Sequence, residues 1–330
     1  MRQLLAASVL AMAALGLAGS DARAASYGAF TSFWAFGDSL TDDGNLYAAT
    51  GGAAPPPPYF EGRFSNGPVW AEHVEADFTA AGLAAENFAF GGAAVGALAN
   101  GPLPSPPVAN LDGQIARFAE ASRGRLGERP VASLWFGANN LLFDGIPNGD
   151  ARAVGRAAAR GVAAGARELQ RLGVGHVVLF NLPALDKTPR FALSGDPVAT
   201  EQARIGSLAF NRALERGAAR LEKRGMKVIR VDMYGLFNEL LADPQKFGVV
   251  DATAPCLLPT DPPRYCGSTV AQLLAFFDPV HPNATVHAAI ADEVRGEVAP
   301  VPLPAPALML LAALGALGLA ARRRPETAAS

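Results

Sequence analysis

Three side chains in two short segments of this sequence could perform nucleophilic catalysis. Ser39 follows an apolar run that ends at Gly37, which predicts a hydroxyl at the carboxyl edge of a sheet, where open α/β folds bind their ligands. Asp278 and His281 lie three residues apart in a loop that Pro279 stiffens. A reactive hydroxyl needs a base to take its proton and an acid to fix that base. We therefore predict acyl transfer with Ser39 as nucleophile, His281 as base and Asp278 as the orienting acid.

These residues require a scaffold that ends several strands at one edge. Apolar runs predict five strands, at 33–37, 85–90, 131–136, 176–181 and 227–232. Helical spacing predicts helices from about residue 68, at 111–121, at 150–172, at 200–224 with Thr200 as N-cap, and at 284–294. Strands that alternate with helices are typical of a doubly wound parallel sheet. We expect one α/β domain over residues 25–300.

Composition argues against nucleic acid as a partner. Half of the 330 residues are hydrophobic, 18% are charged and the formal net charge is −2, so the chain can bury a large core. The only Lys/Arg-rich run is at 322–324, and we expect no basic patch.

The first 24 residues have the features of a secretory signal peptide. Arg2 precedes an apolar run over 4–18, and Ala22-Arg23-Ala24 fits a cleavage site. The alternative is an N-terminal membrane anchor. We expect export across the inner membrane and a mature chain that begins near Ala25.

Export makes a disulfide the natural state of the two cysteines. Cys256 and Cys266 lie ten residues apart in a proline-rich segment, and in an oxidising compartment such cysteines are expected to pair. A loop this short gains roughly 2–3 kcal/mol of stability from the bond. A metal site is not expected there, because no third cysteine or nearby histidine completes a ligand set.

Four ordered blocks resemble the motifs of the GDSL esterase/lipase family, also called SGNH hydrolases. They are residues 36–45 (FGDSLTDDGN), 87–93 (NFAFGGA), 137–140 (GANN) and 278–282 (DPVHP), and residues 62–67 (GRFSNG) resemble the segment after the first block. The resemblance covers about residues 34–294. It implies a flavodoxin-like, three-layer α/β/α sandwich with a central, mainly parallel five-stranded sheet. It also implies a serine ester hydrolase that needs no metal or cofactor.

The resemblance further implies the groups that stabilise the oxyanion. These are the backbone N–H groups of Ser39 and Gly92 and the side-chain amide of Asn139, with Gly91 as the alternative to Gly92. The family has Asp where this chain has Asn140. We expect the change to leave the amide donor intact while the support of its loop becomes neutral.

Other functions use the same residues. Asp38, Asp42, Asp43, Asp278 and His281 could form a metal site, but their spacing does not match a calcium loop and an N-cap role suits the first three equally. An acyltransferase would use the same site with another acceptor. A non-catalytic surface or extracellular-matrix protein could have the same fold. The sequence does not specify the acyl chain or the alcohol, and the segments 48–59, 98–110 and 251–275 are expected to shape the pocket.

The C-terminal residues 301–330 are expected to lie outside the domain. A proline motif over 301–306 precedes an apolar run over 307–321 and three arginines, an ending that resembles PEP-CTERM sorting signals with a VPLP variant of the motif. A simple membrane anchor is the alternative. The resemblance implies membrane contact through this segment and cleavage by an exosortase, after a signal peptidase has removed the first 24 residues. The expected substrate is a small-molecule, lipid or polysaccharide ester at the cell surface or outside the cell.

Overall fold

The computed structural model describes residues 30–101, 108–258, 260 and 262–298. The expected signal peptide and the C-terminal sorting segment lie outside these ranges. Within the ranges, no helix has both the length and the apolar character that crossing a membrane requires.

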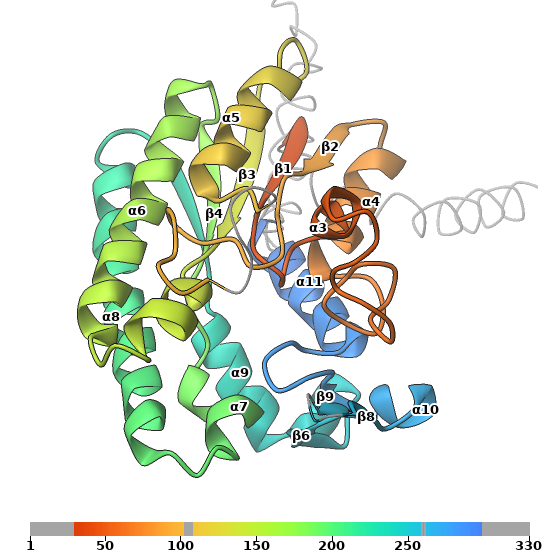
Figure 1. The fold of residues 1–330 in the computed structure, drawn as a ribbon. Helices are drawn as coiled ribbons and strands as arrows, with labels where there is room; N and C mark the ends of the chain where they lie inside the picture. The colour runs from red at the N-terminus through yellow and green to blue at the C-terminus, as the bar shows by residue number, and fades with distance from the viewer. Residues whose placement is uncertain (1–29, 102–107, 259, 261, 299–330) are drawn as a thin grey trace, which may run out of the picture.

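Five parallel strands form the central sheet, in the order β2-β1-β3-β4-β5 (Figure 1). The strands are β1 (Ser32–Gly37), β2 (Ala84–Asn87), β3 (Pro130–Trp135), β4 (His176–Phe180) and β5 (Lys227–Val231). The predicted fold class, an α/β sandwich with a parallel five-stranded sheet, is confirmed. Gly37 pairs with Trp135 where β1 and β3 end, so the loops after these two strands start side by side.

Helices cover both faces of the sheet. One face packs against α5 (Leu111–Ala121), α6 (Ala151–Arg171) and α8 (Pro197–Glu222), and the other against α4 (Trp70–Ala80), α9 (Met233–Ala242) and α11 (Ala284–Val298). Each face has its own apolar core, because side chains of a strand alternate between the two faces. Phe36 packs against Phe118 of α5, whereas Phe33 packs against Phe78 of α4.

Short elements make up most of the edge that carries the candidate site. They are α3 (Asn45–Ala49), a π-helical turn η1 (Asn140–Gly145), 3₁₀ turns η2 (Leu185–Lys187) and η3 (Pro244–Phe247), α7 (Pro189–Ala192) and α10 (Ser268–Ala271). The helix α9 was not predicted from the sequence, and the predicted helix at 284–294 continues to Val298.

The predicted N-cap of the long helix α8 is wrong. The helix begins at Pro197, and the carboxylate of Asp196 accepts hydrogen bonds from the backbone N–H groups of Val198 and Ala199. Pro197 fits the first helical position because its missing N–H would have no partner there. Thr200 lies inside the first turn, where its hydroxyl donates to the Asp196 carbonyl.

The segment before the Asp278 loop folds into two small sheets. Strand β6 (Asp251–Pro255) runs parallel to β9 (Leu274–Phe276), and β7 (Leu257–Leu258) pairs with the antiparallel β8 (Arg264–Tyr265). Cys256 and Cys266 form a disulfide across the base of the second pair, with their Cα atoms 5.0 Å apart. These strands connect the cysteine loop directly to the chain that enters the candidate site.

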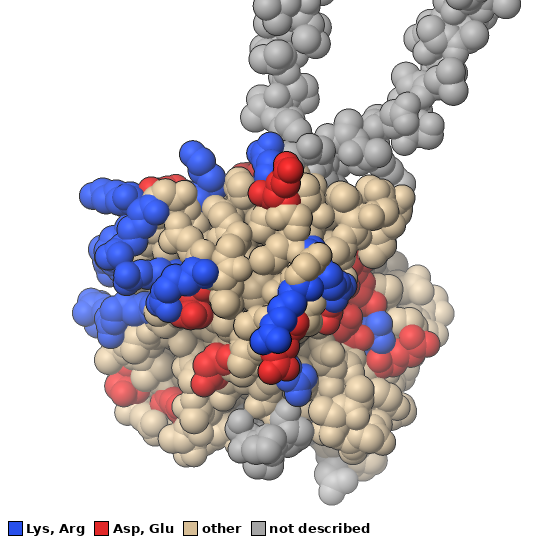
Figure 2. Space-filling model, turned by 90° about the horizontal axis from the view of Figure 1, so that it is seen from above, with Lys and Arg blue, Asp and Glu red and all other residues tan. Residues whose placement is uncertain are grey.

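Arginines form two exposed rows along α6 and at α8. Figure 2 shows Lys and Arg side chains gathered on one side of the molecule. The rows are Arg152, Arg156, Arg160, Arg167 and Arg171 on α6, and Arg212, Arg216, Arg220 and Arg224 on α8 and just beyond its end. The expectation of no basic patch is therefore wrong. Linear runs do not reveal residues that the helical period brings onto one face.

The helices α6 and α8 come close together at Gly155. A Cβ at this position would lie 2.7 Å from the Gly206 carbonyl oxygen, closer than real Cβ contacts. We expect Gly155→Ala to lower the free energy of unfolding by about 1–3 kcal/mol, because a packed backbone cannot move aside cheaply. Gly296→Ala in α11 is the matched control: its Cβ would meet nothing within 4 Å, and we expect it to raise stability by about 0.4–1 kcal/mol. Urea unfolding of both variants measures the difference, and equal effects would contradict this packing.

Candidate active site

Strand β1 ends in a backbone turn that presents Ser39. A Cβ at Gly37 would lie 2.5 Å from the Thr41 hydroxyl oxygen, so only glycine allows the chain to fold back this tightly. The buried Gln114 of α5 accepts from the Gly37 N–H at 3.0 Å and donates to the Gly37 carbonyl at 2.8 Å. Sequence reasoning missed Gln114, although a glutamine on the apolar stripe of a helix was a usable signal.

The structure brings Ser39, His281 and Asp278 together in one chain of hydrogen bonds. The Ser39 Oγ lies 2.7 Å from His281 Nε2, and His281 Nδ1 lies 2.6 Å from Asp278 Oδ2. Ser39 and Asp278 are buried, and the ring of Phe64 packs on the imidazole with centroids 5.0 Å apart. With Nδ1 protonated toward Asp278, Nε2 is free to accept the serine proton.

The Asp278 carboxylate accepts four hydrogen bonds. Its Oδ1 takes the backbone N–H groups of Val280 and His281 at 2.8 and 2.7 Å. Its Oδ2 takes the Tyr59 hydroxyl at 2.5 Å in addition to the imidazole. No motif marked Tyr59, which follows four consecutive prolines in the segment 48–59. The Tyr59 hydroxyl thus joins this segment to the loop of Asp278 and His281, a contact that the sequence did not predict.

Asp278 and His281 each shift the pKa of the other toward the charged form. Burial opposes charge on Asp278, but the charge and hydrogen bonds of His281 and the Tyr59 hydroxyl outweigh it and lower the carboxyl pKa. Burial likewise opposes charge on His281, but the charge and hydrogen bond of Asp278, and the charge of Asp38, raise the pKa of His281 above its ordinary value. Burial, and then the negative charge of Asp278, raise the pKa of Tyr59, which stays a donor.

Asp38, beside the serine, is a second buried acid. Its Oδ1 accepts the Leu40 N–H at 3.1 Å, and its Oδ2 is buried with no partner among the described residues. Burial raises the pKa of Asp38 to about 7, although the positive charge of His281 opposes that shift. Asp38 is therefore held much closer to neutrality than Asp278.

The predicted oxyanion donors lie around the serine. Gly92 and Asn139 line a cavity of about 350 Å³ together with Ser39 and His281. Gly92 has φ +78, a conformation that glycine adopts readily, and its N–H has no partner among the described residues. The Gly91 N–H instead donates to Asp42 at 2.6 Å, so of the two glycines only Gly92 offers a free donor. One N–H of the Asn139 amide donates to the Ala93 carbonyl at 2.8 Å, which leaves the other available.

The Asp42 carboxylate ties the loop after β1 to the loop after β2. Besides Gly91, it accepts the backbone N–H groups of Gly44, Asn45 and Leu46 at the start of α3, at 2.6 to 3.1 Å. Asp42 thus binds the N–H groups at the start of α3 from two residues before the N-cap residue, Gly44. In the described part of the chain no three His, Cys, Asp or Glu side chains are grouped as a metal site would require, and this holds for the alternative set of Asp38, Asp42, Asp43, Asp278 and His281.

Asn140 uses both ends of its amide. Its Oδ1 accepts the Val95 N–H at 3.0 Å and its Nδ2 donates to the Val95 carbonyl at 3.3 Å. An aspartate could not make the second bond. The neutral residue therefore holds the Asn139 loop against the Gly92 loop through two hydrogen bonds.

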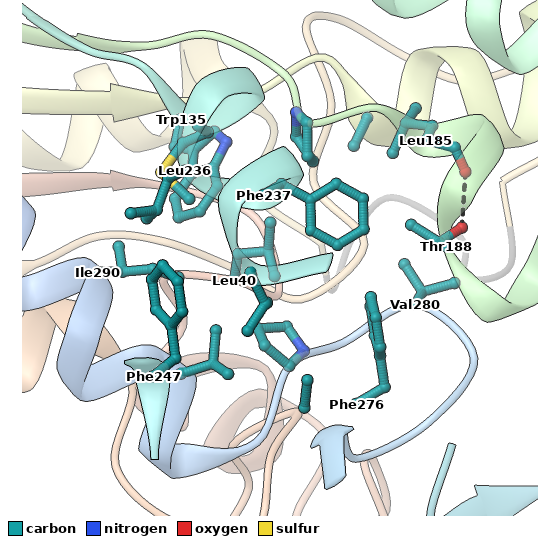
Figure 3. A pocket seen from close by; sticks show the side chains of 17 residues that line it. Leu40, Trp135, Leu185, Thr188, Leu236, Phe237, Phe247, Phe276, Val280 and Ile290 are labelled. Carbon is teal, nitrogen blue, oxygen red and sulfur yellow. Dashed lines mark hydrogen bonds between the residues drawn. The ribbon is translucent and has the colours of Figure 1, made fainter. Parts of the chain in front are cut away.

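Two further hollows adjoin the serine cavity. A groove of about 670 Å³ lies on the other side of His281 and is lined largely by prolines and leucines. A small cavity of about 70 Å³, shown in Figure 3, lies behind Leu40 and Val280 and is almost wholly apolar, with Phe237 and Phe276 on its walls. Leu40 and Val280 line both this cavity and the serine cavity. The site can thus contact alkyl groups next to the reacting carbonyl.

Comparisons with known proteins identify the family of the chain. Residues 33–294 match the family described as GDSL-like Lipase/Acylhydrolase. The phosphatidylcholine-sterol acyltransferase of Aeromonas hydrophila is 35% identical over 75% of this chain and 70% of its own length. An acetylesterase of Thermothelomyces thermophilus is 26% identical over 79% and 87%. Among solved structures, an acetylxylan esterase from Geobacillus stearothermophilus aligns over 83% and 96% of the chains with 15% identity and a TM-score of 0.42.

Proposed function

The chain belongs to the GDSL-like lipase/acylhydrolase family and is a carboxylic ester hydrolase, and we propose that it works through an acyl-enzyme formed on Ser39. The predicted enzyme class is confirmed by the family match. The observation that carries the proposal is the continuous chain of hydrogen bonds from the Ser39 hydroxyl through His281 to Asp278.

The first half of the reaction forms the acyl-enzyme. His281 Nε2 takes the serine proton while Oγ attacks the ester carbonyl, and Asp278 stabilises the imidazolium that results. The backbone N–H groups of Ser39 and Gly92 and the free N–H of Asn139 then donate to the oxyanion. One such donor is typically worth about 3 kcal/mol in the transition state. His281 returns the proton to the leaving alcohol.

The second half releases the acid. Water takes the place of the alcohol, His281 Nε2 accepts its proton, and the hydroxide attacks the acyl carbonyl. Collapse of the second tetrahedral intermediate returns the proton to the Ser39 oxygen. Every proton in the cycle passes through one nitrogen, so no metal or cofactor is required by this chemistry.

Substitution of the nucleophile tests the mechanism. We expect Ser39→Ala to lower kcat for a p-nitrophenyl ester by about 10⁴-fold or more and to abolish labelling by a fluorophosphonate. Ser133→Ala is the matched control, because this buried hydroxyl in β3 has no partner among the described residues, and its activity should equal that of the wild type. Turnover retained by Ser39→Ala would contradict the mechanism. Loss of wild-type activity in a chelator would favour a metal enzyme, and absence of labelling would favour a non-catalytic surface protein.

The hydrogen bond from Tyr59 to Asp278 predicts a change in pH dependence. His281 must be neutral to act as base, so kcat/KM rises with pH through a His281 pKa above its ordinary 6.5. In Tyr59→Phe the carboxylate loses a donor and attracts the imidazole proton more strongly, which moves this rise to higher pH. We expect kcat to fall about tenfold, since a hydrogen bond to a charged group is worth about 1.5 kcal/mol or more.

The control for this variant is Tyr234→Phe, on α9 and outside all three hollows. A lowered kcat with an unmoved pH profile would assign Tyr59 a purely structural role and contradict the proposed coupling to His281.

Acyl transfer to an alcohol is the second candidate function. The similarity to the Aeromonas acyltransferase favours it, and the site geometry allows it because any hydroxyl that replaces water at His281 can accept the acyl group. The division of products between free acid and new ester in the presence of added alcohols decides between the two.

We also propose that the protein is exported and contacts the membrane through residues 301–330. The signal-peptide features of 1–24 and the resemblance of the C-terminal segment to PEP-CTERM signals support this location, with signal peptidase and an exosortase as processing partners. We expect intact-mass measurement of the protein from a host with an exosortase to show a chain that begins near Ala25 and ends near the proline motif. A full-length chain that starts at Met1 would contradict export, and an intact C-terminus in the membrane fraction would indicate a simple anchor.

A further inference from the structure

Arg190 lies where the two larger hollows meet. It lines both the serine cavity and the adjoining groove, as do His281, Tyr59 and Val280. Among the described residues, no other Lys or Arg lines either wall. A group bound beside the catalytic histidine in either hollow therefore lies close to the guanidinium.

The backbone fixes Arg190 to the catalytic loop. Its N–H donates to the carbonyl of Pro279 at 2.9 Å, and Pro279 lies between Asp278 and Val280 in that loop. The residue lies in α7, which starts at Pro189 after a turn closed by the Thr188 hydroxyl. The segment that carries this side chain is therefore hydrogen-bonded directly to the loop of Asp278 and His281.

The exposed Arg190 side chain has no ion-pair partner among the described residues, whereas other Arg and Lys side chains form ten ion pairs in that part of the chain. Burial lowers the pKa of Arg190 and the negative charge of Asp278 opposes this shift, and an arginine remains charged in either case. The Asp278 carboxylate already accepts four hydrogen bonds from other groups. Asp38, the other acid near the serine, has a pKa that is raised to about 7. The guanidinium thus makes no direct ion pair, and its N–H donors are available to a ligand in either hollow.

The reaction places the alcohol part of the substrate next to this cation. His281 must protonate the leaving oxygen, so the alcohol lies against the imidazole, which shares both hollows with Arg190. The groove walls, among them Pro57, Leu193 and Leu257, are apolar and suit alkyl chains. The cation and the apolar groove walls both suit an alcohol that has an anionic group a few bonds from the ester oxygen and also an alkyl chain. Glycerophospholipids have this arrangement.

We propose that Arg190 binds the phosphate of an ester's alcohol part, so that the enzyme prefers glycerophospholipid esters to neutral esters of the same acyl chain. Guanidinium donates two parallel hydrogen bonds to a phosphate, which fixes the substrate as well as attracting it. The inference rests on the proposed function, because it needs the alcohol part to lie at His281.

The test compares dihexanoyl phosphatidylcholine with dihexanoylglycerol, which differ in the phosphate-bearing headgroup. We expect Arg190→Gln to lower the ratio of their kcat/KM values about tenfold or more, mainly through KM. Arg190→Lys should lose less, because it keeps the charge but not the planar donors. Arg156→Gln, in the exposed row on α6, is the matched control and should leave the ratio unchanged.

Two outcomes would overturn the proposal: an unchanged ratio, or an equal loss on both substrates. Inorganic phosphate should inhibit p-nitrophenyl ester hydrolysis by the wild type competitively, and Arg190→Gln should lose this inhibition. If Arg190→Gln loses inhibition by phosphate but keeps the wild-type ratio of kcat/KM values, Arg190 binds free phosphate and its role in substrate choice is overturned. If the wild type neither hydrolyses a p-nitrophenyl ester nor reacts with a fluorophosphonate, the proposed function itself fails.

Discussion

The site depends on one buried carboxylate that does not take part in the reaction. Asp42 accepts four backbone N–H groups, three from the loop of the nucleophile and one from Gly91 in the loop of Gly92. Burial raises the pKa of Asp42, but the four hydrogen bonds oppose that shift. They also replace the hydrogen bonds to water that the carboxylate loses on burial. The same bond occupies the Gly91 N–H and leaves that of Gly92 unpaired. Together with Asn45, which donates to the carbonyls of Asn87 and Ala89, this side chain sets the spacing between the Ser39 loop and the Gly92 loop.

The parallel sheet makes this arrangement possible. Strands β1, β2 and β3 end at the same edge, so their loops meet although they are distant in sequence. The catalytic loop arrives from the far end of the chain, after β9 and before α11, and its Asp278 hydrogen bonds are partly local. The loop of Asp278 and His281 is joined to the scaffold by the serine–histidine contact, by the Tyr59 hydroxyl, and by hydrogen bonds of Ser65 to Pro282 and of Arg190 to Pro279.

The parts of the site that depend on local chemistry could be predicted from the sequence. Ser39, Asp278 and His281 are marked by strand ends, prolines and block order, and the five strands by apolar runs. Tyr59 and Gln114 could not be assigned, because their partners are 219 and 77 residues away along the chain. The N-cap Asp196 was missed because Thr200, four residues later, offers the same chemistry, and only the helix start at Pro197 decides between them.

The two acids near His281 are similarly buried, and their hydrogen bonds account for the opposite shifts of their pKa values. Asp38 and Asp278 are almost equally inaccessible, with 1% and 6% of their surfaces exposed, and burial disfavours the charge of both. Asp278 accepts four hydrogen bonds and has a lowered pKa, whereas Asp38 accepts one from Leu40, leaves Oδ2 unpaired and has a pKa raised to about 7. Only Asp278 is therefore fully ionised at neutral pH and able to stabilise the imidazolium. A full second charge at Asp38 would raise the pKa of His281 further and favour the protonated imidazole, so the shortage of donors at Asp38 favours the neutral imidazole that the proposed base requires.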